Sequence, residues 1–196
     1  IVAWSDSGDL RRRGVLTAAG YARRGAAERQ GRCRPSPQPL RPPLPPGFAV
    51  RAVRVPDDLE ARSWASWRAF HPNDADDRYQ GADWYLPNIT AQPLYRPDLD
   101  LVVAAPDGRV ASFTTIWLDE RTNTACFEPV GTAPEFQRRG LAMALLAEGL
   151  ARLAALGVER AFVGGYREAA CSLYAAAGFI DADWSEPWLK EWAPGG

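Results

Sequence analysis

The chain has 196 residues, a formal net charge of −1 at pH 7 and a hydrophobic content of 46%, which fits one ordinary globular domain with an additional segment. No run of eighteen apolar residues occurs, so the composition argues against a membrane-spanning helix. Three cysteines without a C-x-x-C pair, together with a single histidine, argue against a disulfide framework, a zinc site and a Cys–His nucleophile, and they favour a reducing cytoplasm.

Charge is distributed unevenly along the chain. Residues 1–47 hold nine arginines against three acidic residues, whereas residues 48–196 hold fourteen basic against twenty-one acidic residues. An acidic domain disfavours nucleic acid or phosphorylated acceptors and suits a cationic amine. We therefore expect a small-molecule or peptide amine as the partner, neither nucleic acid nor a membrane, and we leave a homodimer open.

The N-terminal part is predicted to contain a strand over Ile1–Trp4 and a helix over Asp9–Ala19 that ends at Gly20. Because the chain starts at Ile rather than Met, we expect a processed or truncated product, and the arginine-rich start also resembles a transit peptide. Seven prolines in residues 32–46 predict an extended linker, with a domain boundary at Gly47.

A helix is predicted to begin near Pro56 and to run through Trp64, Trp67 and Phe70. These aromatic residues lie three positions apart, on one helical face, which indicates either core packing or one wall of an acceptor pocket. His71 follows at the helix end, where a structural or capping role fits better than that of a base.

The stretch from residue 71 to residue 95 is predicted to be irregular, apart from a short helix near Asp83–Ile89, because it contains several prolines and Gly81. Asp74, Asp76 and Asp77 in this stretch could attract a cationic acceptor, or they could simply form a solvated acidic surface.

Strands are predicted over residues 48–53, 100–105, 109–117, 124–132, 161–164, 180–184 and 188–192. Pro106, Asp107 and Gly108 join two of them as a hairpin. The strand over 124–132 is expected to be interrupted, because Pro129 cannot donate a ladder hydrogen bond and Gly131 suits a bulge.

The turn at residues 137–142 opens the longest helical pattern of the chain, which ends at Gly157. Gly140 allows a ligand to approach the backbone closely, and the helix start presents unpaired N–H groups and the positive end of its dipole. Arg138 and Arg139 add positive charge, which favours a diphosphate. A Walker-type nucleotide site is excluded, because no Gly-Lys-Ser/Thr follows the turn.

The Q-x-x-G-x-A turn at Gln137–Ala142, followed by L-Y-x-x-x-G-F at Leu173–Phe179, resembles the GCN5-related N-acetyltransferase (GNAT) superfamily over roughly Gly47–Trp192. The resemblance implies an α+β (α/β) fold, in which helices flank a mixed, mainly antiparallel sheet with a β-bulge and splayed central strands. It also implies acetyl transfer from acetyl-coenzyme A to an amine, without a metal.

The resemblance also implies roles for individual residues of the coenzyme site. The backbone of Val130, Gly131 and Thr132 would pair with the pantetheine arm. The pyrophosphate would be held by Gln137, Arg138, Arg139, Gly140, Leu141 and Ala142. Arg167 stands where many members have Asn, which leaves one pantetheine or acceptor contact open.

Two residues are candidates for proton transfer. Tyr174 would protonate the leaving thiolate, the alternative being a packed core tyrosine. Glu128 precedes Val130 by two residues and is our candidate base for the amine, although an outward-facing strand glutamate is an equal alternative. The acceptor itself would contact Trp64, Trp67 and His71.

An internal similarity bears on the N-terminal segment. Aligning Ala18–Tyr21 with Ala176–Phe179 places helix over helix and, approximately, strand over strand. We therefore interpret residues 1–31 as the partial tail of an upstream, degenerate GNAT-like domain, 32–46 as a linker and 47–196 as the acetyltransferase domain. Leu16 then falls at the position of Tyr174, so the partial copy should be inert.

Two other functions would use the same fold: a non-catalytic acyl-coenzyme A sensor, and a regulatory subunit that docks a partner through its tryptophan-rich face. Tyr174 and the complete turn at 137–142 favour an enzyme. The acceptor stays open among polyamine-like, aminoglycoside-like and aromatic amines and peptide amino termini.

Overall fold

The computed structural model describes residues 1–191, which fall into two compact units. Unit 1 combines Ile1–Cys33 with the chain from Phe162 onward, and unit 2 is Arg34–Ala161. The boundary falls within strand β8 (Arg160–Gly165). Among the residues described, no helix is both long and apolar enough to cross a membrane.

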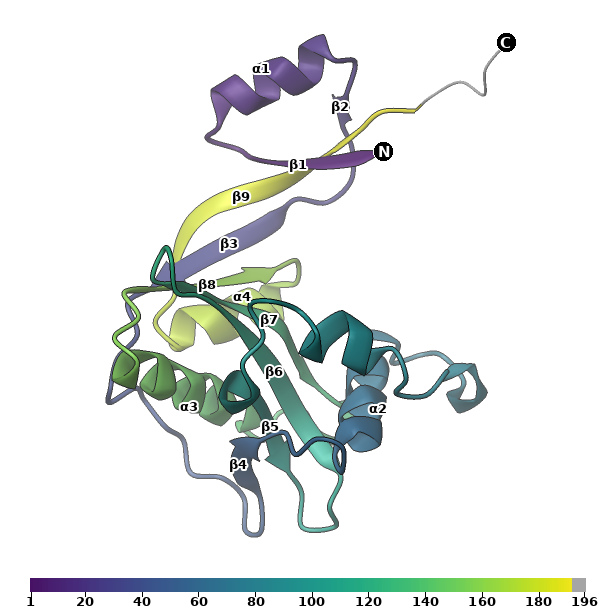
Figure 1. Cartoon of the computed structure of the whole chain (residues 1–196), viewed down its shortest axis with the longest axis vertical. Helices are drawn as coiled ribbons and strands as arrows, with labels where there is room; N and C mark the ends of the chain where they lie inside the picture. The colour runs from purple at the N-terminus through teal and green to yellow at the C-terminus, as the bar shows by residue number, and fades with distance from the viewer. Residues whose placement is uncertain (192–196) are drawn as a thin grey trace. The chain divides into compact units, whose positions relative to one another are not determined.

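Unit 1 is built around β9 (Ile180–Leu189), and Figure 1 shows β1 and β3 lying beside it. β9 pairs antiparallel with β1 (Val2–Asp6), β2 (Ala22–Arg23) and β3 (Glu28–Cys33). Among the described residues of unit 1, every strand that pairs with β9 therefore comes from the N-terminal segment.

The prediction of two separate C-terminal strands is wrong, because β9 continues through Ser185 and Pro187. Trp4 pairs with Pro187 and Glu28 pairs with Ser185, so strands from the other end of the chain hold β9 together across the expected break. Residue 192, where the second strand was expected to end, lies outside the described residues. β3 also extends through Cys33, into the segment predicted as linker.

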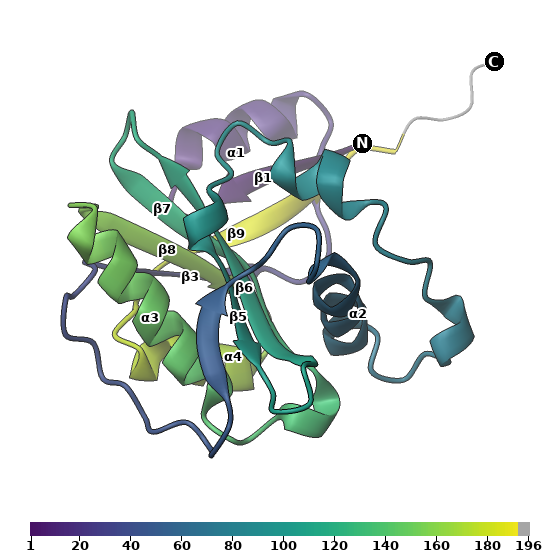
Figure 2. The same ribbon diagram turned by 60° about the horizontal axis from the view of Figure 1, so that its bottom comes forward.

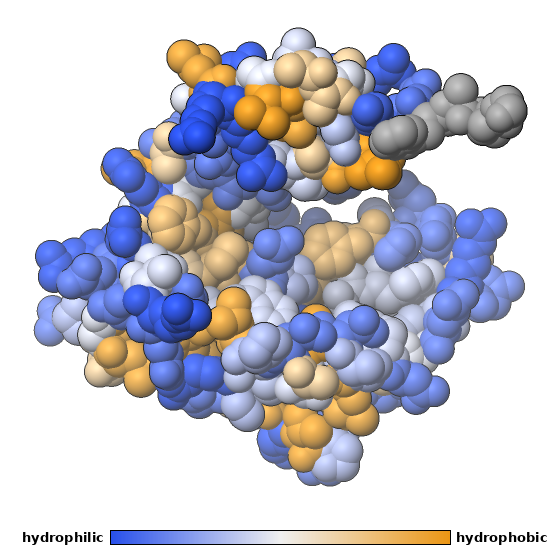
Figure 3. Space-filling view, turned by 45° about the horizontal axis from the view of Figure 1, so that its top comes forward, coloured by the Kyte–Doolittle hydropathy of each residue, from blue (hydrophilic) through white to orange (hydrophobic). Residues whose placement is uncertain are grey.

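The helices of unit 1 have recognisable signals at their ends, and α1 agrees with the helix predicted over Asp9–Ala19. α1 (Leu10–Ala18) starts after Asp9, whose carboxylate accepts the backbone N–H of Arg12 at 2.9 Å. α4 (Glu168–Ala176) is followed by Gly178, with a φ of 96°. On α1, Leu10 is 75% exposed. Figure 3 shows hydrophobic groups, in orange, beside hydrophilic groups, in blue, on the viewed surface.

Unit 2 contains an antiparallel sheet in the order β4-β5-β6-β7. The strands are β4 (Ala49–Ala52), β5 (Asp100–Ala104), β6 (Val110–Asp119) and β7 (Thr124–Thr132). The predicted hairpin between β5 and β6 is confirmed, and its Gly108 has a φ of 85°.

Two helices cover opposite faces of this sheet, α2 (Leu59–Phe70) and α3 (Leu141–Ala155), as Figure 2 shows. The guanidinium of Arg62, on α2, lies 4.0 Å from the centroid of the Phe113 ring. Gly149, on α3, faces Ile116 so closely that a Cβ there would lie 2.6 Å from its Cδ1 atom. Side chains three positions apart on one strand point to opposite faces, so β6 lies between the two helices.

A buried ion pair joins α2 to β5 and β6. Arg62 and Asp100 are 1% and 0% exposed, and Arg62 Nε lies 3.9 Å from Asp100 Oδ1. Asp100 also accepts hydrogen bonds from the hydroxyls of Tyr85 at 2.5 Å, Tyr95 at 3.1 Å and Thr115 at 3.2 Å. Burial raises the pKa of both tyrosines, and the Asp100 charge adds to the effect, so both hydroxyls stay protonated and donate.

The connection between α2 and β5 is irregular, as predicted. Its expected helix near Asp83–Ile89 is instead a short π-helical turn at Leu86–Thr90, with 3₁₀ turns at Asp76–Arg78 and Pro97–Leu99. Of the two interpretations of the aromatic face of α2, core packing does not hold, because Trp64 and Trp67 are only half-buried and Phe70 is exposed. The buried side of α2 consists of Leu59, Arg62, Ser63, Ala65 and Ser66.

We expect Asp100→Ala to lower the free energy of unfolding by about 3–5 kcal/mol, because it leaves the Arg62 guanidinium buried without its counter-ion. Urea denaturation measures the change. Asp107→Asn, which removes an exposed carboxylate that pairs with Arg109, is the control and should leave the midpoint unchanged. Equal midpoints for native protein and Asp100→Ala would contradict this account of the pair.

Candidate functional site

The turn before α3 has the backbone geometry of an anion site. Gly140 is the N-cap of α3 with a φ of 75°, and no side chain caps the helix start. Arg138 also has a positive φ, 63°, which is uncommon for a residue with a side chain. Intrahelical bonding begins with the N–H of Ala144, which donates to Gly140 O at 3.0 Å. The N–H groups of the first helical turn are thus available to a diphosphate.

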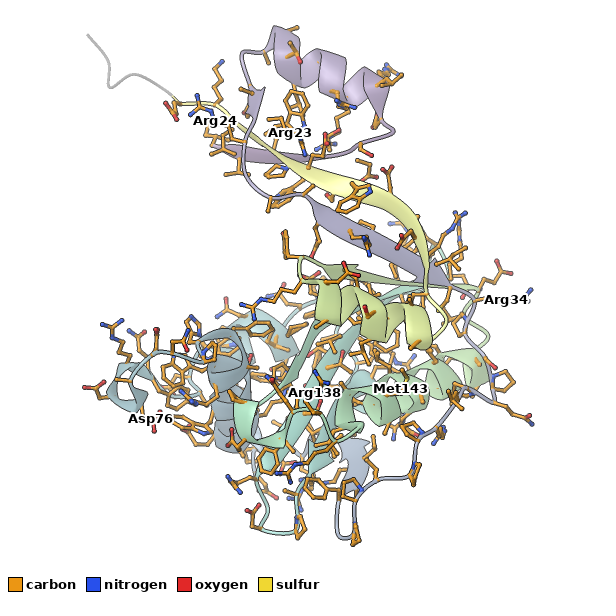
Figure 4. The ribbon with its side chains drawn as sticks, turned by 180° about the vertical axis from the view of Figure 1, so that it is seen from behind. Arg23, Arg24, Arg34, Asp76, Arg138 and Met143 are labelled. Carbon is orange, nitrogen blue, oxygen red and sulfur yellow. The ribbon has the colours of Figure 1, made fainter. Side chains whose placement is uncertain are left out.

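The two arginines of the turn differ in their surroundings, and Figure 4 labels one of them, Arg138. Arg139 donates from Nη2 to Glu135 O at 3.0 Å, and its guanidinium lies over the Phe136 ring. Arg138 is exposed and makes no hydrogen bond or ion pair with another residue in the part of the chain that the structure describes. Gln137 donates its side-chain amide to Thr132 O at 3.2 Å, which links the turn to the end of β7. Arg138 is therefore the better placed of the two arginines to meet an anion.

β7 is interrupted where the sequence predicts. Thr114 pairs with Val130 and Ile116 pairs with Phe127, so β7 carries one residue more than β6 between these pairs. The extra length falls at Glu128 and Pro129. The predicted interruption near Pro129 is confirmed, whereas Gly131, the residue expected to suit a bulge, pairs regularly with Phe113.

The register on either side of Gly131 shows which backbone groups face β6. Ala133 N donates to Ala111 O, and in an antiparallel ladder alternate residues bond to the same neighbour. Gly131 therefore turns its backbone groups toward β6, whereas Val130 and Thr132 turn theirs away from it. A Cβ on Gly131 would lie 2.2 Å from Phe113 Cζ, so only glycine fits there.

The candidate base and the candidate acid differ in exposure. Glu128 is exposed at the bulge, and its carbonyl oxygen accepts the indole N–H of Trp117 at 2.6 Å. Tyr174, on α4 in unit 1, is 8% exposed, and its ring packs edge-to-face on Phe179 at 6.3 Å. The Glu128 side chain therefore points to solvent, while Tyr174 is packed and retains a small accessible area.

A cavity of about 540 Å³ lies between the C-terminal half of α2 and the connection that follows it. Its aromatic lining comes from Trp67, Phe70, His71, Tyr79 and Trp84, and its polar lining from Ser66, Asp74, Arg78, Gln80 and Gly81. This volume suits a small organic molecule, and the mixture of aromatic and polar groups is typical of ligand pockets.

The predicted acceptor residues lie at this cavity with different roles. Trp67 and His71 line it, and their rings stack with centroids 5.8 Å apart and an interplanar angle of 16°. Trp64 lies behind them, with its ring centroid 5.4 Å from that of Trp67 and 5.0 Å from that of Tyr79. His71 also caps α2, since its backbone N–H donates to Trp67 O and its Nδ1 lies 3.1 Å from the same oxygen.

The acidic residues after His71 do not act as one cluster. Asp74 lines the cavity, whereas Asp76 lies 3.5 Å from Arg68 in an ion pair.

Among the cysteines, burial raises the pKa of the Cys33 thiol to about 12, so it stays protonated at neutral pH and is a poor nucleophile.

Sequence reasoning missed Tyr79 and Trp84 of the cavity and the buried Arg62 and Asp100 beneath it. Tyr79 and Trp84 occur in an irregular stretch without periodicity, so no pattern predicts which way their side chains point. For Arg62, a signal was present: an arginine between Leu59 and Ala65 stands on the apolar side of the helix.

The Acetyltransferase (GNAT) family model matches residues 58–179. The chain belongs to this family. Among curated relatives, a mycothiol acetyltransferase of Clavibacter michiganensis subsp. michiganensis (strain NCPPB 382) is 34% identical over 144 residues, which are 71% of this chain and 45% of that protein. The chain thus spans less than half the length of this relative.

Solved GNAT structures share the fold. A GCN5-related N-acetyltransferase from Sphaerobacter thermophilus has a TM-score of 0.72 and 19% identity, over 99% of this chain and 60% of that one. A tandem GNAT protein from the clavulanic acid biosynthesis pathway has a TM-score of 0.76 and 15% identity, over 100% of this chain and 65% of that one. The predicted fold class, a mainly antiparallel mixed sheet flanked by helices, is confirmed.

Proposed function

We propose that this protein transfers the acetyl group of acetyl-coenzyme A to a primary amine of a small molecule or peptide by direct attack. The observation that carries the proposal is the pairing, within unit 2, of an anion-binding turn at 137–142 with a bulged strand that ends at Thr132. The side chain of Gln137 joins the two through its hydrogen bond to Thr132 O. Membership of the GNAT family supports the same chemistry.

The two parts of this site suit two parts of acetyl-coenzyme A. The first-turn N–H groups of α3 and the cation of Arg138 suit the diphosphate. The backbone groups of Val130 and Thr132, which face away from β6, suit the amides of the pantetheine arm, which would bind as an added strand. Gly131 contributes by lacking a side chain, which lets Phe113 pack beneath the strand.

In this proposal, Glu128 is the base that accepts a proton from the amine, and Tyr174 is the acid that protonates the thiolate. An alkyl ammonium with a pKa near about 10.4 must lose a proton before its nitrogen can attack, and Glu128 is exposed at the bulge to accept that proton directly or through water. An unperturbed tyrosine hydroxyl has a pKa near about 10 and holds its proton at neutral pH, so a tyrosine at position 174 can give a proton to the departing thiolate.

The acceptor is proposed to bind at the aromatic cavity, against Trp67 and His71 with Trp64 behind them. Asp74 supplies a carboxylate in the lining that suits a cationic amine. The name of the mycothiol acetyltransferase relative adds mycothiol-related amines to the acceptors worth testing. We place the activity in the cytoplasm.

The first test is calorimetric binding of acetyl-coenzyme A combined with thiol release across a panel of amines, including mycothiol-related ones. We expect Tyr174→Phe to bind the coenzyme like the native protein and to lower kcat about 10²- to 10⁴-fold, because it removes the proton donor and keeps the ring packing. Tyr21→Phe, a matched loss of a hydroxyl elsewhere in unit 1, should leave kcat unchanged. Binding without turnover on any amine would instead favour a non-catalytic sensor.

A second prediction concerns pH. Glu128→Gln should lower kcat/KM about 10²- to 10⁴-fold near neutral pH, where the amine is protonated, and the deficit should shrink as the pH rises toward the amine pKa of about 10.4. A pH profile of kcat/KM measures this. The control Glu120→Gln removes an exposed carboxylate that pairs with Arg96 and should follow the native profile. A deficit that stays constant over the whole pH range would argue against Glu128 as the base.

A further inference from the structure

The linker before β4 contacts the anion-binding turn. We call residues 41–48 the docked linker; it contains no helix or strand. The Pro42 ring carbons Cγ and Cβ lie 3.7 and 3.8 Å from the position that a Cβ on Gly140 would take. These are ordinary van der Waals distances, so the Pro42 ring packs beside the N-cap of α3.

The other end of the docked linker contacts the residue that precedes the turn. The Phe48 ring lies 6.0 Å from the Phe136 ring at an interplanar angle of 77°, a favourable edge-to-face arrangement. Phe136 is 4% exposed and immediately precedes Gln137, and the Arg139 guanidinium lies 5.6 Å from the same ring. The docked linker therefore contacts the turn at Gly140 through Pro42, and the residue just before the turn through Phe48.

An ion pair with α3 also holds the docked linker in place. Arg41 Nη1 lies 2.7 Å from Glu148 Oε2 on α3, and Arg152 Nε donates to the other oxygen of Glu148 at 2.8 Å. Burial raises the pKa of Glu148, but the hydrogen bonds from Arg152 and Arg41 outweigh that effect, so its pKa lies below the usual value and the carboxylate stays charged at neutral pH.

The end of the docked linker is a tight turn that requires glycine. Phe48 N donates to Pro45 O at 3.1 Å, and Gly47 has a φ of 80°, as the third residue of a type II turn does. A Cβ on Gly47 would lie 2.6 Å from Pro106 Cγ. The linker thus packs directly on the β5–β6 hairpin before β4 begins.

We propose that the docked linker positions the anion-binding turn for the coenzyme, so that Pro42 and Arg41 are positioning residues; this inference rests on the proposed function. The turn holds Arg138 at a positive φ, a conformation that persists only where surrounding structure over-determines it. Pro42 packs beside Gly140 and Phe48 packs on Phe136, so the docked linker constrains the chain on both flanks of Arg138. A turn that is preorganised in this way binds a diphosphate more tightly, because less ordering remains to be done on binding.

The test compares two acetyl donors. Acetyl-coenzyme A carries the diphosphate, whereas S-acetylpantetheine has the same thioester and pantetheine arm without any phosphate. We expect Pro42→Gly to raise the Kd of acetyl-coenzyme A roughly 2- to 30-fold and to leave kcat/KM with S-acetylpantetheine unchanged. Pro43→Gly, the same change at the exposed neighbouring residue, is the matched control and should alter neither value.

A second pair of variants guards against a folding defect. Arg41→Gln breaks the ion pair with Glu148, so it should raise the Kd of acetyl-coenzyme A and leave kcat/KM with S-acetylpantetheine unchanged, as Pro42→Gly does. Arg34→Gln, at an exposed position before the docked linker, should leave both values as in the native protein. Unchanged coenzyme affinity in both Pro42→Gly and Arg41→Gln would overturn the inference, as would equal losses with both donors. Failure of the native protein to bind acetyl-coenzyme A would overturn the proposed function itself.

Discussion

The buried Arg62–Asp100 pair is the interaction on which unit 2 depends. Hydrogen bonds stabilise the acidic side of this pair, because Tyr85, Tyr95 and Thr115 all donate to Asp100. On the basic side, Arg62 Nη2 donates to Thr115, whereas Nε and Nη1 make no hydrogen bond within the described residues. The partners of Asp100 come from the irregular connection after α2 and from β6. The pair therefore fixes α2 and the connection to the sheet, and with them the walls of the aromatic cavity, which that helix and connection form.

β6 links this buried pair to the coenzyme site. Thr115 Oγ1 accepts a hydrogen bond from Arg62 Nη2 at 3.3 Å. Thr115 also lies where the ladder between β6 and β7 changes register. Phe113, two residues earlier, carries Arg62 over its ring and occupies the space that a side chain on Gly131 would need. One strand thus supports the cavity on its α2 face and sets the backbone direction of Val130 and Thr132 along its edge.

The sequence was most informative where a local signal sets the structure. The interruption of β7 follows from Pro129, and the turn geometry follows from Gly140 at the start of an apolar helix. The sequence did not predict features that depend on contacts between residues far apart in the chain. β9 continues through Pro187 because β1 pairs there, and the aromatic face of α2 is half-buried because Arg62 occupies the core side. The pairing of β1 with β9 is not visible in a hydrophobic pattern, which reports only local periodicity, whereas the place of Arg62 between Leu59 and Ala65 was a signal that the aromatic spacing obscured. The partition into residues 1–31, 32–46 and 47–196 stays a prediction, as do the roles of Glu128 and Tyr174.

The central claim is that acetyl-coenzyme A binds along the end of β7 and at the start of α3. Amide hydrogen exchange, measured with and without the coenzyme, tests this most directly, because it locates the ligand on the backbone. We predict slower exchange in peptides that contain residues 130–132 and 138–143, and no change in peptides from α1. Unchanged exchange at both places in the presence of saturating coenzyme would contradict the account.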